Sequence, residues 1–216
     1  MRAFRVVFRG IVASAAFLYT PLLTLGASAP PVKDTRPAIV AFGDSLTAGL
    51  GLQPGEAYPE QLQKLLDREG LRFRVVNQGI SGDTTEGGLD RVRQVLELRP
   101  KVVILELGAN DGLRGLPLTT TKANLSEMVD AFRKAGAKVL LAGMTLPRNY
   151  GPDYVQGFER LYAQLAQEKH VALIPFLLDG VATNPKLMQR DALHPTAEGA
   201  RRVAATVRRY IAPLLR

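Results

Sequence analysis

Residues 38–47 read Ala38-Ile39-Val40-Ala41-Phe42-Gly43-Asp44-Ser45-Leu46-Thr47. Five apolar residues followed at once by glycine and polar residues are typical of a buried strand that ends in a tight turn. Ser45 lies just beyond the end of that strand. The chain contains no cysteine and only two histidines, so a serine activated by a histidine is the simplest nucleophilic chemistry open to it.

Apolar runs of this kind recur along the chain, and stretches with helical periodicity separate them. In one such stretch, Leu89, Val92 and Leu96 fall on one face of the predicted helix. Strands that alternate with helices imply right-handed crossovers, so we expect a three-layer α/β domain built on a parallel sheet. Because the runs are almost continuously apolar, we expect each strand to be buried on both faces. The predicted strands are 38–42, 73–77, 102–106, 138–142 and 171–175.

The composition fits a single globular domain of ordinary size. The 216 residues are 46% hydrophobic and 22% charged, with a formal net charge of +8. No basic cluster is interleaved with aromatic residues, so we expect no nucleic-acid partner. A mildly basic surface favours anionic substrates and transient contact with membrane lipids. Two histidines without cysteine offer few ligands beyond carboxylates, so we expect no metal and no cofactor. We expect a monomer.

The N-terminus has the features of a secretory signal. Three basic residues open the chain, a mostly apolar segment occupies residues 11–25, and small residues that fit a cleavage site follow it. The basic residues are Arg2, Arg5 and Arg9, and the small ones are Ala27, Ser28 and Ala29.

These features predict a signal peptide at residues 1–29, with cleavage near 27–29, followed by a flexible lead-in at 30–37 and a folded domain at 38–216. Pro30 disfavours cleavage directly before it, so cleavage two residues earlier and retention as an uncleaved anchor both stay open. The predicted location is the periplasm or the exterior of the cell.

Polar residues follow four of the five predicted strands. In parallel α/β sheets the working residues collect beyond the carboxyl ends of the strands, so we expect these segments to meet at one edge. The segment 176–195, which contains the last of these residues, is the longest stretch without clear periodicity. Long loops in compact domains are often functional. The residues concerned are Ser45 after the first strand, Gly82 after the second, Asn110 after the third, and Asp191 with His194 after the fifth.

The chemistry of acyl transfer assigns each of these residues a role. His194 can take the proton of Ser45 near neutral pH, and Asp191, three residues earlier, can hold the other ring nitrogen and fix the tautomer. The attacked carbonyl oxygen becomes negative and needs donors. The backbone N–H groups of Ser45 and Gly82 and the side chain of Asn110 are the candidates. The sequence therefore predicts a serine hydrolase.

Taken together, the four segments resemble the SGNH (GDSL-type) hydrolase superfamily. The matching residues are Ser45 in Gly43-Asp44-Ser45-Leu46, Gly82, Asn110 in Gly108-Ala109-Asn110-Asp111, and His194 with Asp191 before it. Segments 80–84, 106–115 and 146–151 are similar to the periplasmic thioesterase, lysophospholipase and arylesterase subgroup. The resemblance spans residues 38–212.

The resemblance implies a flavodoxin-like fold with five parallel strands in the order 2-1-3-4-5. It implies hydrolysis of carboxylic esters and thioesters through an acyl-enzyme, with aryl esters, short- to medium-chain acyl esters, acyl-CoA and lysophospholipids as substrates. It also implies a mobile loop at 112–117 that helps to hold the acyl chain. The predicted substrate-binding residues are Gly112, Leu113, Leu116, Leu146 and Tyr150.

Two other functions stay open at this point. A carbohydrate acetylesterase could use the same residues on the same fold, and a non-catalytic lipid-binding protein could retain the fold alone. Each key residue also has an ordinary structural interpretation when it is considered singly. Ser45 can cap a helix, and Asn110, which precedes Asp-Gly, can belong to a turn. Asp44 is expected to support the turn before Ser45.

Overall fold

The computed structural model describes residues 34–216. The predicted signal peptide and residues 30–33 of the predicted lead-in lie outside the described residues. Within the described part of the chain, no helix has both the length and the apolar character that a membrane span requires.

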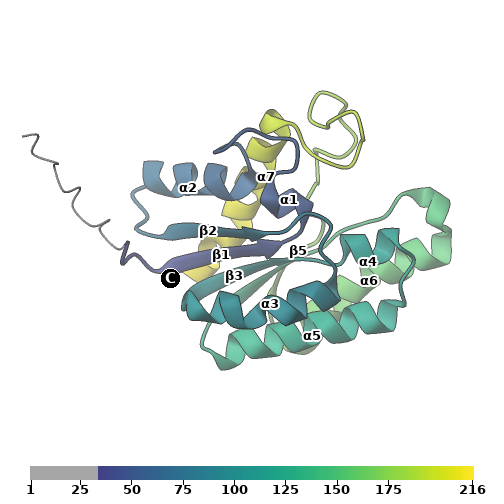
Figure 1. Ribbon diagram of the computed structural model, residues 1–216, viewed down its shortest axis with the longest axis horizontal. Helices are drawn as coiled ribbons and strands as arrows, with labels where there is room; N and C mark the ends of the chain where they lie inside the picture. Colours follow the sequence, from purple (N-terminus) through teal and green to yellow (C-terminus); the bar gives the residue numbers. More distant parts are fainter. Residues whose placement is uncertain (1–33) are drawn as a thin grey trace, which may run out of the picture. The chain divides into compact units, whose positions relative to one another are not determined.

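Five parallel strands form one sheet in the order β2-β1-β3-β4-β5 (Figure 1). The predicted fold class and strand order are therefore confirmed. The strands are β1 (Ala38–Gly43), β2 (Arg74–Gly79), β3 (Pro100–Glu106), β4 (Lys138–Ala142) and β5 (Ala172–Ile174).

Helices cover both faces of the sheet (Figure 1). On one face α2 (Tyr58–Arg68) packs against α7 (Ala197–Ile211). On the other face α5 (Leu118–Lys134) packs against both α3 (Thr85–Glu97) and α6 (Pro152–Lys169). The predicted three-layer α/β/α architecture is confirmed.

The prediction that every strand is buried on both faces is wrong for the two edge strands. The three central strands β1, β3 and β4 are almost entirely buried, whereas all of β2 and most of β5 are only half-buried. An edge strand has a neighbour on one side only, so β2 accommodates the polar residues Arg74, Asn77 and Gln78.

Helix α3 packs against the core over a wider face than its apolar stripe alone. Leu89, Val92 and Leu96 are partly buried against the core, and Thr85, Gly88 and Val95 are buried beside them. A Cβ atom at position 88 would lie 2.4 Å from Leu107 Cδ1. Glycine at this position therefore allows α3 to approach β3 closely.

The carboxyl ends of all five strands meet at one edge of the sheet. Two short helices begin there, α1 (Ser45–Ala48) after β1 and α4 (Ala109–Leu113) after β3. The turn η1 (Arg148–Tyr150) follows β4, and a long segment that contains an isolated bridge between Met188 and Pro195 follows β5. The chain ends in the short helix η2 (Ala212–Leu215) after α7.

Candidate active site

Ser45 is the first residue of α1 and follows the carboxyl end of β1, one of the three inner strands. Asp44 caps this helix, because its Oδ1 accepts a hydrogen bond from the Leu46 N–H at 3.0 Å. The Asp44 side chain is buried, with 1% of the residue exposed. The strand-to-helix turn thus holds Ser45 at the edge of the sheet, and the predicted supporting role of Asp44 is confirmed.

Ser45, His194 and Asp191 form a continuous hydrogen-bonded line. Ser45 Oγ lies 2.8 Å from His194 Nε2, and His194 Nδ1 lies 2.7 Å from Asp191 Oδ2. The other oxygen of Asp191 accepts the backbone N–H groups of Leu193 at 2.9 Å and of His194 at 3.0 Å. Slight burial works against ionisation of Asp191, but the hydrogen bonds from His194 and these N–H groups outweigh it and lower the pKa to about 2.

Gln189 links the segment that carries His194 to the loop that follows Ser45 and α1. The Gln189 side chain donates to the carbonyl of Leu50 at 2.7 Å and to that of Pro195 at 2.9 Å. The Gln189 N–H donates to the His194 carbonyl at 2.7 Å. These bonds give an otherwise irregular segment a fixed path past Ser45.

The backbone N–H groups of Ser45 and Gly82 are the two predicted backbone donors for the oxyanion. Among the described residues, neither the Ser45 N–H nor the Gly82 N–H donates to another protein group. Gly82 has a φ of +82°, a conformation that L residues rarely adopt, and an added Cβ would meet no protein atom within 4 Å. The conformation of the turn, rather than crowding, is what favours glycine at this position.

Asn110 uses both hydrogens of its side-chain amide in this structure. Its Nδ2 donates to Asp44 Oδ2 at 3.0 Å and to the Asp83 carbonyl at 2.9 Å. An NH₂ group has two hydrogens, so a substrate oxygen would have to share or displace one of these bonds. Both partners are acceptors, which fixes the orientation of the amide.

Arg91 braces the turn that carries Gly82, a role that the sequence did not reveal. Its guanidinium forms an ion pair with Asp83, with both side chains about nine-tenths buried, and donates to the Gln78 carbonyl at 3.1 Å. The guanidinium also lies 4.6 Å from the centroid of the Phe42 ring. No pattern in the sequence marked Arg91, because it lies away from the predicted apolar stripe of its helix.

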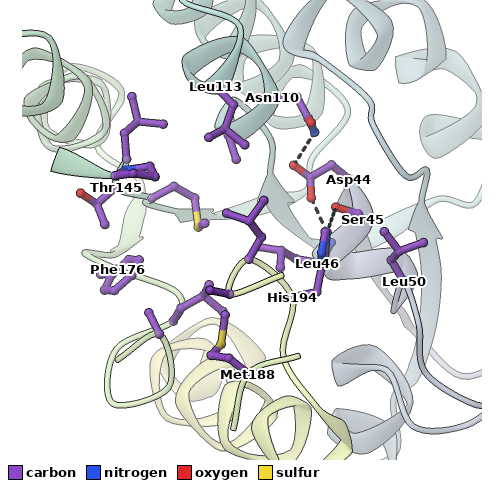
Figure 2. A pocket seen from close by; sticks show the side chains of 18 of the residues that line it. Asp44, Ser45, Leu46, Leu50, Asn110, Leu113, Thr145, Phe176, Met188 and His194 are labelled. Carbon is purple, nitrogen blue, oxygen red and sulfur yellow. Dashed lines mark hydrogen bonds between the residues drawn. The ribbon is translucent and has the colours of Figure 1, made fainter. Parts of the chain in front are cut away.

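A crevice of about 430 Å³ opens beside Ser45 and His194. Figure 2 shows Leu113, Phe176 and Met188 around the space next to these two residues. Most of the lining is apolar and comes from segments after β1, β3, β4 and β5. It includes Leu46, Leu50, Met144, Phe176, Leu178 and Met188.

Two of the five predicted substrate-binding residues line the crevice, and three do not. Leu113 and Leu146 line the crevice, whereas Gly112, Leu116 and Tyr150 are not among its lining residues. Tyr150 lies behind the wall, where its hydroxyl donates to the Leu113 carbonyl at 2.8 Å. Direct contact of these three residues with substrate stays a prediction. In the described chain, no group of three or more His, Asp or Glu residues is arranged to hold a metal ion.

Comparison with known proteins places this arrangement in a family. The GDSL-like Lipase/Acylhydrolase family matches residues 41–202. The chain is 44% identical over 178 residues to Esterase TesA of Pseudomonas aeruginosa, covering 82% of this chain and 89% of that protein. It is 36% identical to Thioesterase 1/protease 1/lysophospholipase L1 of Escherichia coli, covering 92% of each.

Among solved structures, the esterase EstA from Pseudoalteromonas, inhibited by monoethylphosphonate, superposes with a TM-score of 0.79 at 35% identity. The match covers 82% of this chain and 98% of that one. The match to the family extends from β1 to α7 and includes Ser45, Gly82, Asn110, Asp191 and His194. The chain belongs to the GDSL-like Lipase/Acylhydrolase family.

Proposed function

We propose that the chain is a serine esterase that hydrolyses carboxylic esters and thioesters through an acyl-enzyme. The observation that carries this proposal is the line from Ser45 Oγ through His194 to Asp191, with contacts of 2.8 and 2.7 Å, at the mouth of an apolar crevice. Such a line activates a hydroxyl that is otherwise a poor nucleophile.

In the acylation step, Ser45 Oγ attacks the carbonyl carbon of the substrate and its proton passes to His194 Nε2. Asp191 keeps the Nδ1 proton in place and stabilises the imidazolium. The tetrahedral oxyanion lies between the N–H groups of Ser45 and Gly82 and the amide of Asn110. His194 then protonates the departing alcohol or thiol as its bond to the carbonyl carbon breaks.

In the deacylation step, water enters where the leaving group was. His194 takes a proton from this water, which attacks the acyl carbon, and the same three donors receive the second oxyanion. Ser45 Oγ leaves with the proton that His194 returns, and the free acid departs.

The lining of the crevice favours an acyl chain as the bound part of the substrate. Side chains such as Leu46, Met144 and Phe176 offer no donors or acceptors to sugar hydroxyls, which argues against the carbohydrate acetylesterase. The short contact between Ser45 and His194 argues against a protein that only binds lipid. The relatives named above are an esterase and a thioesterase/lysophospholipase, which supports aryl esters, short- to medium-chain esters, acyl-CoA and lysophospholipids as substrates.

The rim of the crevice supports transient contact with lipid. The large hydrophobic side chains that are exposed in the described chain all lie on loops at the carboxyl edge of the sheet. Contact of this rim with a lipid aggregate would bring lysophospholipid tails to the crevice. These residues are Leu50, Ile80, Leu116 and Leu193, between 37% and 49% exposed.

Ile80 allows a test of the lipid contact, because it lies outside the lining of the crevice. We expect Ile80→Ser to reduce co-sedimentation with phosphatidylglycerol vesicles while turnover of a soluble short-chain ester stays unchanged. Undiminished co-sedimentation, or no binding by the wild type, would exclude this contact.

We further propose that residues 1–29 direct export of a monomer to the periplasm. N-terminal sequencing of an exported, tagged protein tests the role of residues 1–29 in export, and we expect the N-terminal segment to be lost. A retained N-terminus in the cytoplasmic fraction contradicts it. Light scattering of the mature chain tests the second part, and a dimeric mass contradicts it.

The proposed activity is tested with Ser45→Ala on a panel of p-nitrophenyl esters, acyl-CoA and acetylated sugars. The wild type should hydrolyse the acyl esters and acyl-CoA far faster than the acetylated sugars, and Ser45→Ala should lose at least about 10³-fold in kcat. Ser126→Ala, a serine on α5 outside the crevice, is the matched control and should keep full activity. Turnover by Ser45→Ala near that of the wild type would refute the proposal.

A further inference from the structure

A fully buried carboxyl group lies directly beneath the nucleophile turn. Glu106 is the last residue of β3, pairs with Gly43 across the sheet, and has no exposed surface. Its Oε2 accepts the Asp44 N–H at 3.2 Å and the Thr47 hydroxyl at 2.8 Å. Its Oε1 is buried and has no hydrogen-bond partner among the described residues. A carboxylate in this position would be costly, because no cation acts on it.

The surrounding groups leave only one place for a proton on Glu106. Thr47 donates its single hydrogen to Glu106, so the Tyr58 hydroxyl, 3.1 Å from Thr47 Oγ1, must be the donor in that contact. Oε2 is therefore occupied by two donors, whereas Oε1 is free to carry a hydrogen.

The backbone beside Glu106 is shaped to admit this side chain. A Cβ atom at Gly43 would lie 2.2 Å from Thr47 Oγ1 and 2.4 Å from Glu106 Oε2. The glycine that precedes Asp44 is therefore needed for the contact between Glu106 and the turn.

Asp44 carries a second buried carboxyl group beside Glu106. Two carboxylates buried side by side repel each other, so one of them holds a proton. Both oxygens of Asp44 accept donors, from the Leu46 N–H and the Asn110 amide, whereas Glu106 Oε1 has no partner, so the proton resides on Glu106. Burial raises the pKa of both groups, and the neighbouring Asp44 charge raises that of Glu106 further.

We propose that Glu106 is a positioning residue that keeps its proton and stays neutral beneath the nucleophile turn, where its Oε2 accepts the Asp44 N–H and the Thr47 hydroxyl. Asp44, the carboxylate of the two, accepts the Leu46 N–H at 3.0 Å and the Asn110 amide at 3.0 Å. The first of these bonds fixes the turn that carries Ser45, and the second orients the amide of Asn110.

Loss of the Glu106 proton would place two buried carboxylates in contact, and the turn would move. The other titratable groups facing Glu106 are Tyr58 from α2 and Tyr162 from α6, and burial raises the pKa of both phenols. Both therefore stay neutral while Glu106 titrates, so they cannot supply the missing positive charge.

Two substitutions test whether Glu106 acts in its neutral form. In Glu106→Gln, the side chain stays neutral and its oxygen can still accept from Thr47 and the Asp44 N–H, so we expect kcat within about tenfold of the wild type. In Glu106→Leu, this acceptor is lost, and we expect kcat to fall by about 10²-fold through misplacement of the turn, with KM changed by less than about threefold. If Glu106→Gln lost as much kcat as Glu106→Leu, the proposal would be overturned.

A second measurement does not depend on catalysis. A group whose pKa is raised on folding binds a proton in the folded state that the unfolded state has released, so stability falls as pH rises toward the folded pKa. Between the ordinary pKa of a glutamate and neutral pH, the folding equilibrium constant of the wild type should fall roughly tenfold per pH unit relative to that of Glu106→Gln. Equal pH dependence in the two proteins would contradict a protonated Glu106.

If Glu106→Gln does not fold, the infrared spectrum of the wild type still decides the matter. We expect the carbonyl stretch of a protonated carboxyl group at neutral pH, and its absence would overturn the proposal. The effect on kcat rests on the proposed function, whereas the stability slope and the infrared band do not. A protein without esterase activity could therefore still confirm the proton on Glu106.

Discussion

Replacement of Asn110 by alanine tests whether its amide serves the reaction as well as the fold. The side chain donates at 3.0 Å to the Asp44 carboxylate and at 2.9 Å to the Asp83 carbonyl, and it borders the crevice beside Ser45. Asn110→Ala removes both bonds and also one of the three donors that we assign to the oxyanion.

The two effects have different magnitudes. A hydrogen bond to a charged group contributes about 1.5–3 kcal/mol and a neutral one about 0.5–1.5 kcal/mol, so the free energy of unfolding should fall by roughly 2–4 kcal/mol. Loss of one oxyanion donor should lower kcat by about 10²–10³-fold. KM should change by less than about threefold, because the donor acts on charge that develops in the transition state.

The assay combines urea denaturation with p-nitrophenyl butyrate kinetics. The kinetics are measured without urea, at a temperature where the variant is fully folded. Asn124→Ala is the matched control, because Asn124 donates at 3.0 Å to Thr85 Oγ1 outside the crevice. The control should lose stability but keep kcat. If Asn110→Ala retained kcat within tenfold, its amide would have only a structural role and the reasoning would be refuted.

Four further outcomes follow from the same geometry. Asp191→Asn should lower kcat by roughly 10²–10⁴-fold, because the amide would donate to His194 Nδ1 and enforce the wrong tautomer; a loss below tenfold in ester turnover would argue against this. Because the pKa of Asp191 is lowered from 3.8 to about 2, its stabilising contribution is complete above the ordinary pKa and is lost as pH falls through the folded one. Acid denaturation curves should therefore converge for wild type and Asp191→Asn at the acid end, with a difference below about 1 kcal/mol because the side chain is exposed. Gly82→Ala should lower kcat about tenfold, since forcing an L residue into this conformation costs about 1–2 kcal/mol; an unchanged kcat would show that the turn tolerates a side chain. In a series of p-nitrophenyl esters, kcat/KM should rise about fourfold per methylene until the crevice is full, because each buried methylene is worth about 0.8 kcal/mol; a flat series would contradict an acyl-binding crevice.

Local patterns predicted the frame of the molecule because each pattern had one physical cause. The apolar run before Gly43 predicted a buried strand because a turn signal follows it at once, and this run is β1. The order of the strands came from the resemblance to a family, whereas the residues at the strand ends followed from the strand pattern itself. The burial of Gly88 in α3 depends on its close approach to Leu107, which the pattern of a single helix does not reveal.

The walls and supports of the site were harder to predict. Phe176 and Met188 come from an aperiodic segment, and only its path past Ser45 brings them to the crevice. Glu106 ends a buried strand, where a charged residue suggests an exposed end, yet it is fully buried because Thr47 and the Asp44 N–H bind it. Such contacts join residues about 60 positions apart in the chain, and local sequence rules do not describe them.

Mass spectrometry of the protein after treatment with a fluorophosphonate tests whether Ser45 is the residue that carries the acyl group. A fluorophosphonate reacts with an activated serine and leaves a stable phosphonyl ester that stands in for the acyl-enzyme. The structure predicts one adduct, on the peptide that contains Ser45, with formation slowed strongly in His194→Ala and with ester hydrolysis lost in proportion to labelling. An adduct on a different residue, or full ester hydrolysis by protein labelled at Ser45, would contradict the proposed mechanism.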